Sequence, residues 1–172
     1  IYPIQHYEVT ADGYGVGSDF DNSTAASAIN NVTYETDITI WPITLARVLS
    51  GGTNVALQAN QDITVSDAIT ASNGSGDGGN LTLQAGRSID INADITTDNG
   101  ALTLSANDTS ALNTGITIGT ASIDTTGATI TTGTGSLSAT VATGGYHTSG
   151  DITLAAISTT GTVTLNTPGA AS

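Results

Sequence analysis

The strongest constraint on the fold is a repeat in the middle of the chain. Asn54–Thr70 reads NVALQANQDITVSDAIT, Asn80–Thr96 reads NLTLQAGRSIDINADIT, and a third copy opens over Ala101–Asn107 with ALTLSAN. The copies start 26 and then 21 residues apart (54 to 80, and 80 to 101), which is a period typical of repeat architectures. Apolar and polar residues alternate within each copy, so the repeated unit is a set of short strands joined by turns.

Each copy contains three short groups of apolar residues that would face one side. Three groups per repeat predict three sheets around one core, so we expect an all-β parallel β-helix, or β-solenoid. Weaker copies continue the pattern and give roughly five to six coils of about 20–27 residues. We expect right-handed coils, because crossovers between parallel strands are almost always right-handed. The predicted inward positions are Val55, Leu57, Ile63, Val65, Ile69, Leu81, Leu83, Ile89, Ile91, Ile95, Leu102, Leu104, Ile116, Ile118, Ile123, Ile130, Leu137, Val141, Ile152, Leu154, Ile157, Val163 and Leu165.

Glycine- and asparagine-rich stretches separate the predicted strands. We expect turns there, because Gly and Asn adopt positive φ at low energetic cost. Insertions between the repeats fall in these turns, where solenoids tolerate them. The predicted turns lie at residues 73–79, 98–100, 125–127, 143–145 and 159–161.

The segment that precedes Pro42 differs from the repeats. It contains all of the aromatic residues (one Trp, five Tyr and one Phe in the whole chain) except Tyr146. We therefore predict an irregular, aromatic-rich N-terminal cap or docking segment over residues 1–41 and a β-solenoid over residues 42–172.

We expect little regular secondary structure in the N-terminal region. Residues 11–23 are rich in Gly, Asp and Asn and read as a loop, with short extended pieces at residues 4–10 and 32–40 on either side. A helical turn is expected only at Thr44–Ser50, where Gly51 and Gly52 would end it.

The charge balance excludes several classes of partner. Fifteen acidic residues face two basic ones, Arg47 and Arg87, for a net charge of −13 in 172 residues. Nucleic acid is excluded, because binding to phosphates needs a basic surface. Insertion into a membrane is not expected either, because no apolar run approaches the roughly 20 residues of a spanning helix. The chain opens with Ile-Tyr-Pro rather than Met, which suggests a processed product or a part of a longer protein.

The sequence of the repeats resembles that of bacterial filamentous-haemagglutinin-type exoproteins. The resemblance covers about residues 50–165 and is carried by Gly51–Val65, Gly79–Ile95, Gly100–Asn107 and Gly150–Ala156. It implies a right-handed parallel β-helix, export to the cell exterior by two-partner secretion, and a role in adhesion or surface structure.

Candidates for catalysis are few. The two histidines, His6 and His147, lie far apart, and there is no Cys or Lys. Some β-helices cleave polysaccharides with paired carboxylates, and Asp90 with Arg87 is the best candidate here. We expect no enzymatic activity and no cofactor, because no such pair has the supporting groups that catalysis requires. The other acidic pairs close in sequence are Asp90/Asp94, Asp62/Asp67 and Glu35/Asp37.

One acidic stretch has the spacing of a metal loop. Asp19–Ser23 alternates like the start of a calcium-binding loop, but the sixth position is not Gly and the twelfth is not Glu. We therefore expect Asx-rich turns and no metal site.

Five asparagines lie in N-x-S/T sequons, which are acceptor sites for glycosylation in exported proteins. In a chain so rich in Asn, Ser and Thr, chance accounts for several of them. Those in predicted turns, Asn73 and Asn107, are expected to be the most accessible. The candidate glycosylation sites are Asn22, Asn31, Asn73, Asn80 and Asn107.

These features predict an extracellular, cell-surface protein with a structural or adhesive function. It would be part of a bacterial surface fibre or the subunit of a head-to-tail filament, with copies of itself, adjoining repeats or a surface glycan as partners. The alternative is a carbohydrate-binding or carbohydrate-cleaving β-helix, which would need a groove lined with aromatic residues. The candidate docking residues between subunits are Tyr2, Tyr7, Tyr14, Phe20, Tyr34 and Trp41.

Overall fold

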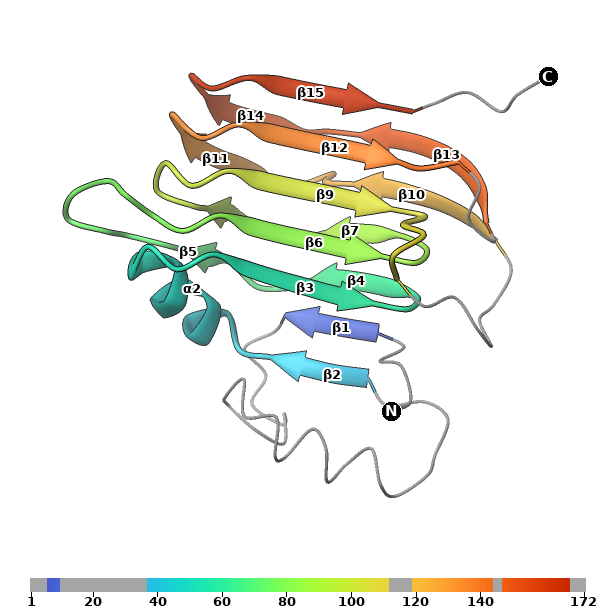
Figure 1. The fold of residues 1–172 in the computed structure, drawn as a ribbon, viewed down its shortest axis with the longest axis horizontal. Coiled ribbons are helices and arrows are strands. Elements are labelled where there is room, and N and C mark those ends of the chain that lie inside the picture. Colours follow the sequence, from blue (N-terminus) through green and yellow to red (C-terminus); the bar gives the residue numbers. More distant parts are fainter. Residues whose placement is uncertain (1–5, 10–36, 112–118, 144–146, 168–172) are drawn as a thin grey trace.

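The computed structural model describes residues 6–9, 37–111, 119–143 and 147–167. These residues are mostly β-strand, in three parallel sheets of stacked strands, with one α-helix near the first coil (Figure 1). The strands are β1 (His6–Val9), β2 (Asp37–Ile40), β3 (Val55–Ala59), β4 (Asp62–Val65), β5 (Ile69–Thr70), β6 (Leu81–Ala85), β7 (Ile89–Ile91), β8 (Ile95–Thr96), β9 (Leu102–Ala106), β10 (Thr120–Asp124), β11 (Thr129–Gly133), β12 (Leu137–Val141), β13 (Thr148–Thr153), β14 (Ala156–Thr159) and β15 (Val163–Asn166), and the helix is α2 (Pro42–Ser50).

The chain visits the three sheets in turn. Sheet 1 has the order β15-β12-β9-β6-β3, sheet 2 has the order β13-β10-β7-β4-β1-β2, and sheet 3 has the order β14-β11-β8-β5. The triplets β3–β5, β6–β8, β9–β11 and β12–β14 each complete one coil, and β15 begins another. The predicted three sheets are confirmed, and the arrangement is consistent with a parallel β-solenoid.

The repeats stack in register, so like side chains lie above one another. Leu81 pairs with Val55 on one side and with Leu102 on the other. Ile63 pairs with Ile89 in sheet 2. The predicted inward residues from Val55 to Leu104, together with Ile123, Ile130, Leu137 and Val141, are all buried. They belong to one continuous apolar core, and Ile116 and Ile118 lie outside the described residues.

The core is incompletely covered at the last coil. Val163 and Leu165 pair with Leu137 and Ala139, so they continue the inward columns of sheet 1. Their side chains are nevertheless 42% and 54% exposed. The prediction that both face the core is right about direction but wrong about burial, because no described strand lies beyond β15.

Helix α2 packs against the first coil. It begins with Pro42 in its first turn and buries Leu45, Ala46 and Leu49, whose spacing places them on one helical face. It ends at Ser50, Gly51 is its C-cap, and the following Gly52 has a φ of 76°. The expected helical turn is confirmed, and it starts at Pro42 rather than at Thr44 as predicted.

A column of glycines lines the corner that leads into sheet 1. A Cβ atom at Gly100 would overlap the carbonyl oxygen of Gly79, one at Gly135 would overlap that of Gly100, and one at Gly161 that of Gly135. These glycines do not have positive φ, in contrast to Asp98 and its neighbour Asn99 in the same turn. The turn prediction therefore gave the wrong reason for Gly100 and Gly161, which allow adjacent coils to approach closely. In the predicted turn at residues 125–127, Gly127 does have a positive φ.

Candidate functional site

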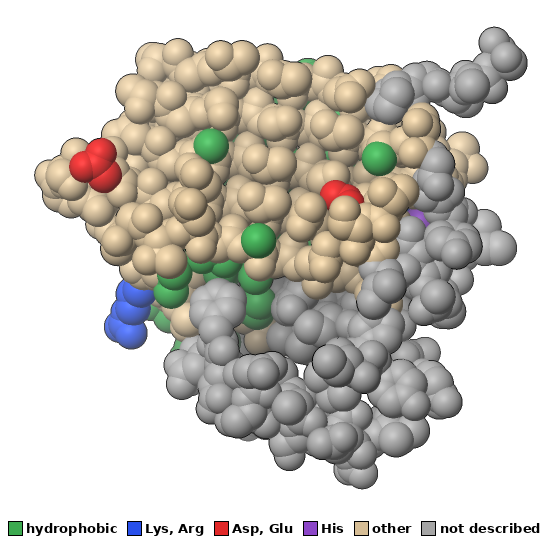
Figure 2. All heavy atoms as spheres, in the orientation of Figure 1, with side chains coloured by type: hydrophobic (Ala, Val, Ile, Leu, Met, Phe, Trp, Pro, Cys, Tyr) green, Lys and Arg blue, Asp and Glu red, His purple; other side chains and the backbone are tan. Residues whose placement is uncertain are grey.

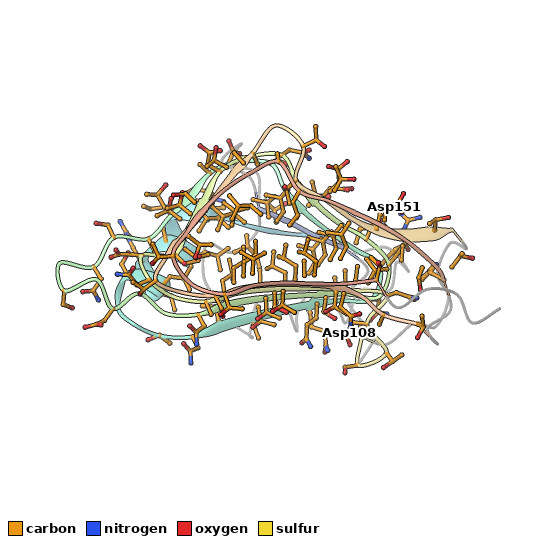
Figure 3. The ribbon with its side chains drawn as sticks, turned by 90° about the horizontal axis from the view of Figure 1, so that it is seen from above. Asp108 and Asp151 are labelled. Carbon is orange, nitrogen blue, oxygen red and sulfur yellow. The ribbon has the colours of Figure 1, made fainter. Side chains whose placement is uncertain are left out.

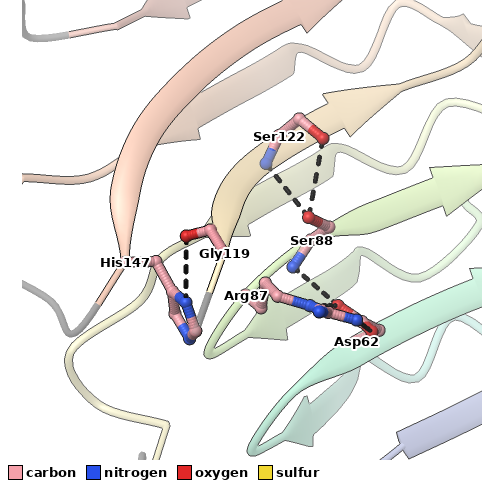
Figure 4. Close-up of polar contacts among 6 residues, drawn as sticks. All are labelled: Asp62, Arg87, Ser88, Gly119, Ser122 and His147. Atoms are coloured by element: carbon pink, nitrogen blue, oxygen red, sulfur yellow. Dashed lines mark hydrogen bonds and ion pairs between the residues drawn. The ribbon is translucent and has the colours of Figure 1, made fainter. Parts of the chain in front are cut away.

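An ion pair on sheet 2 joins the first two coils. The Arg87 Nε donates to Asp62 Oδ1 at 2.8 Å, and its Nη2 atom pairs with Asp62 Oδ2 (Figure 4). The backbone N–H of Ser88 donates to the same carboxylate at 3.0 Å. The hydrogen bond with Asp62 is the main cause that raises the pKa of Arg87, and the charge of Asp90 makes the smallest contribution. Arg87 therefore joins two coils through Asp62, and its interaction with Asp90, the partner considered from the sequence, contributes less to the pKa of Arg87.

The histidine of the described core lies at a corner of the stack. The residue His147 is 6% exposed, and its Nδ1 lies 3.3 Å from the Gly119 carbonyl oxygen (Figure 4). The buried Asn107 donates through Nδ2 to the carbonyl oxygens of Ala142, at 2.7 Å, and His147, at 3.0 Å. These contacts fasten loops of neighbouring coils. His6 lies in β1 and is not near His147 in the stack, because β4, β7 and β10 separate β1 from β13 in sheet 2.

The carboxylates are spread over the stack. Seen from above, Asp108 and Asp151 lie toward the same end of the cross-section, outside the filled core (Figure 3). Asp108 accepts hydrogen bonds from Gln84 Nε2 at 3.3 Å and from the Ser110 backbone N–H at 2.8 Å. Among the described residues, no three His, Asp or Glu side chains come together as metal ligands. The stretch Asp19–Ser23 lies outside them.

The sequons occupy different environments. Asn73 is half-buried and donates to the Ser50 carbonyl oxygen at 2.8 Å, whereas Asn80 is exposed. Asn107 is fully buried, so the prediction that it is among the most accessible is wrong: its side chain holds two loops together. Asn22 and Asn31 lie outside the described residues.

Two of the candidate docking aromatics fall within the described ranges. Tyr7 lies in β1, where it pairs with Ile38 and with Ile63. Trp41 is half-buried and immediately precedes α2. Tyr2, Tyr14, Phe20 and Tyr34 lie outside the described residues.

The outward face of sheet 1 is broad and almost uncharged (Figure 2). Its outward side chains form two columns of hydroxyl, amide and methyl groups that follow the strand register. One column is Ala56, Thr82, Thr103, Ser138 and Thr164, and the other is Gln58, Gln84, Ser105, Thr140 and Asn166. A face of this kind offers neutral hydrogen-bonding groups but no basic or aromatic site.

The two ends of the stack differ in what they expose. At one end, β13, β14 and β15 are the outermost strands of their sheets. Ile152, Leu154 and Ile157 are only partly buried there, next to the exposed Val163 and Leu165. At the other end, α2 covers the core and sheet 2 carries two further strands, β1 and β2. The described part of the chain thus presents one open end and one capped end.

Comparison with protein-family models, curated proteins and solved structures finds no match to this chain. No helix in the described part of the chain is long and apolar enough to cross a membrane.

Proposed function

We propose that this chain is an extracellular structural rod, part of a bacterial surface fibre or the subunit of a head-to-tail filament. In this proposal the three stacked sheets are a right-handed β-solenoid of about five to six coils, of the filamentous-haemagglutinin type. Its export by two-partner secretion and its adhesive role belong to the same proposal.

The observation that carries the proposal is the open end of the stack. Val163 is 42% exposed and Leu165 54%, although both continue columns that are buried in every earlier coil. The outermost strands also present unpaired backbone groups, which invite another strand. In a solenoid each coil covers the face of the next, so this end is suited to a further coil.

The side-chain chemistry also favours a structural role. The described polar clusters, such as Asp62 with Arg87 and Asn107 with His147, connect neighbouring coils. Register-matched contacts of this kind stabilise a rod along its axis. In the proposed fibre, these contacts between coils would make the rod stiff.

The proposal is tested by assembly of the purified chain. Electron microscopy and sedimentation should show filaments whose subunits add at the open end. The variant Leu165→Lys places a charge in the inward column of β15 and should abolish filaments, because burying an unpaired charge is unfavourable.

The matched control is Thr164→Lys, which adds the same charge at the neighbouring outward position of β15. It should leave filaments intact. Monomers of the unaltered chain at high concentration, or filaments that persist in Leu165→Lys, would overturn the proposal.

A further inference from the structure

Strand β1 is an insertion in sheet 2. Asp37–Ile40 (DITI) and Asp62–Val65 (DITV) have nearly the same sequence, and the length of chain between them is close to that between Ile63 and its partner Ile89. Such a spacing should place β2 directly beside β4, as β4 lies beside β7. Instead, β1 lies between β2 and β4 and pairs in register with both. It therefore separates two strands that would otherwise belong to successive coils.

Helix α2 explains why sheet 2 has room for one extra strand between β2 and β4, a place that we call the slot. In the turn between β2 and β3, α2 occupies the position below β5 in sheet 3, and it packs against that strand. A helix with its side chains is about 10 Å across, whereas neighbouring strands are ~4.8 Å apart. Along the stack, the helix therefore takes up the height of two strands below β5 in sheet 3. Sheet 2 needs two strands below β4, β2 and one more, to reach the same height.

The chain between β2 and β4 supplies no second strand for this place, because it forms α2 and β3. The slot is therefore filled by a strand from elsewhere. From β4 onward, every step in sheet 2 moves toward β13, but the step from β1 to β2 moves in the opposite direction. A strand supplied by another molecule would not require that reversal.

We propose that the slot between β2 and β4 is a donor-strand site that accepts residues His6–Val9 of a second copy of this chain. The proposal rests on the filament proposed above and identifies how its subunits are linked. The same backbone hydrogen bonds form whether the strand comes from the same chain or from a neighbour, which is the condition for domain swapping.

The length of the chain permits the exchange. Residues 10–36 separate β1 from β2. A segment of this length, fully extended, reaches about 90 Å. The six strands of sheet 2 span only about 24 Å at ~4.8 Å per step. A strand donated across a whole neighbouring stack is therefore within reach.

Engineered disulfides distinguish the two sources of the strand. The chain has no Cys, and Glu8 is the register partner of Thr64. Adjacent strands are ~4.8 Å apart, which lies within the Cα–Cα range of disulfides. Chains carrying only Glu8→Cys and chains carrying only Thr64→Cys are refolded together from denaturant, oxidised and run on a non-reducing denaturing gel.

We expect a covalent dimer from that mixture and a ladder of multimers from the double variant Glu8→Cys/Thr64→Cys. The matched control pairs Glu8→Cys with Thr70→Cys, an exposed position in sheet 3, and should give no specific cross-link. A double variant that forms only an internally cross-linked monomer would overturn the proposal, and so would the absence of any disulfide.

The outcome is separable from that of the proposed function. Filaments built from internally cross-linked monomers would refute strand exchange and leave the rod function standing. Intermolecular disulfides in closed dimers that never elongate would support strand exchange and contradict the filament.

Discussion

At the scale of residues, the glycine before each later strand of sheet 1 leaves no room for even one added methyl group. At Gly100, a methyl group would overlap the Gly79 carbonyl oxygen, which is backbone and cannot turn away. The variant Gly100→Ala should therefore lose about 1–3 kcal/mol of unfolding free energy, as overpacked sites do. Urea unfolding measures this loss.

The control is Gly74→Ala in the turn after β5, where the added methyl group meets nothing within 4 Å. Its unfolding free energy should change by less than about 0.5 kcal/mol. Equal losses in the two variants would show that the column of glycines does not set the spacing of the coils.

A second effect at this scale concerns Asp124 at the end of β10. Its pKa is lowered by hydrogen bonds from the Thr126 hydroxyl, at 2.5 Å, and from the Thr126 backbone N–H, at 2.8 Å. A lowered folded-state pKa means that the carboxylate stabilises the fold above its usual pKa of about 3.9 and loses this contribution as the pH falls through the lowered value.

The variant Thr126→Ala should move the pKa of Asp124 back toward its usual value, because the hydroxyl is the larger cause of the shift. Carboxyl NMR titration measures the shift directly. An Asp124 pKa that is the same in both proteins would contradict the assignment.

At the scale of elements, α2 closes the core at the end opposite to β15. Leu49 is fully buried, whereas Ile43 in the same helix is 51% exposed. Leu49→Ala should cost about 2–5 kcal/mol, because it leaves a cavity beneath the first coil. Ile43→Ala should cost less than about 1 kcal/mol, since little of its surface is removed from water. Thermal or urea unfolding of both variants tests whether α2 is a cap; equal effects would show that it is not.

The elements were largely predictable because their signals are local. Alternating apolar residues such as Leu81 and Leu83 face a core whichever coil they belong to, and Gly51 follows a helical pattern directly. The pairing of β1 was not predictable in this way. His6 pairs with Asp37 and with Asp62, both distant along the chain, and backbone hydrogen bonds leave no mark in the side-chain pattern.

The polar contacts between coils could not be predicted without knowing which distant segments of the chain lie side by side. Asp62 and Arg87 are 25 residues apart (62 to 87), close to one repeat, and that spacing is the signal that could have paired them. Asn107 looked like an accessible turn residue because it follows a strand and starts a sequon. Its burial depends on where the loops containing Ala142 and His147 return, which the repeat does not specify.

At the scale of the whole molecule, the two ends of the described stack differ, so the proposed filament would be polar. One end has exposed apolar side chains on β15, and at the other end β1 lies between β2 and β4 in sheet 2. Contacts between unlike surfaces give closed rings where the rotation closes and open fibres where it does not, and the proposed filament is the second case. Stacking at β15 and strand insertion beside β4 would then act on the same neighbouring molecules.

The need for six strands in sheet 2 leads to a prediction about the empty slot. A chain that lacks residues 1–9 keeps β2 and β4 but has no strand to place between them. It should bind a synthetic peptide of residues 1–10, because the peptide restores two backbone ladders at once. Fluorescence anisotropy of the labelled peptide measures its affinity.

The control peptide carries Tyr7→Pro and Glu8→Pro. Proline has no N–H to donate, so it removes ladder hydrogen bonds. At about 1 kcal/mol for each lost bond, the affinity should fall roughly tenfold or more. Equal binding of the two peptides would mean that the peptide binds elsewhere. So would tight binding to a full-length Glu8→Cys/Thr64→Cys chain whose own β1 is held between β2 and β4 by an internal disulfide. Loss of binding in that locked chain, with binding retained in the truncated one, would locate the peptide between β2 and β4.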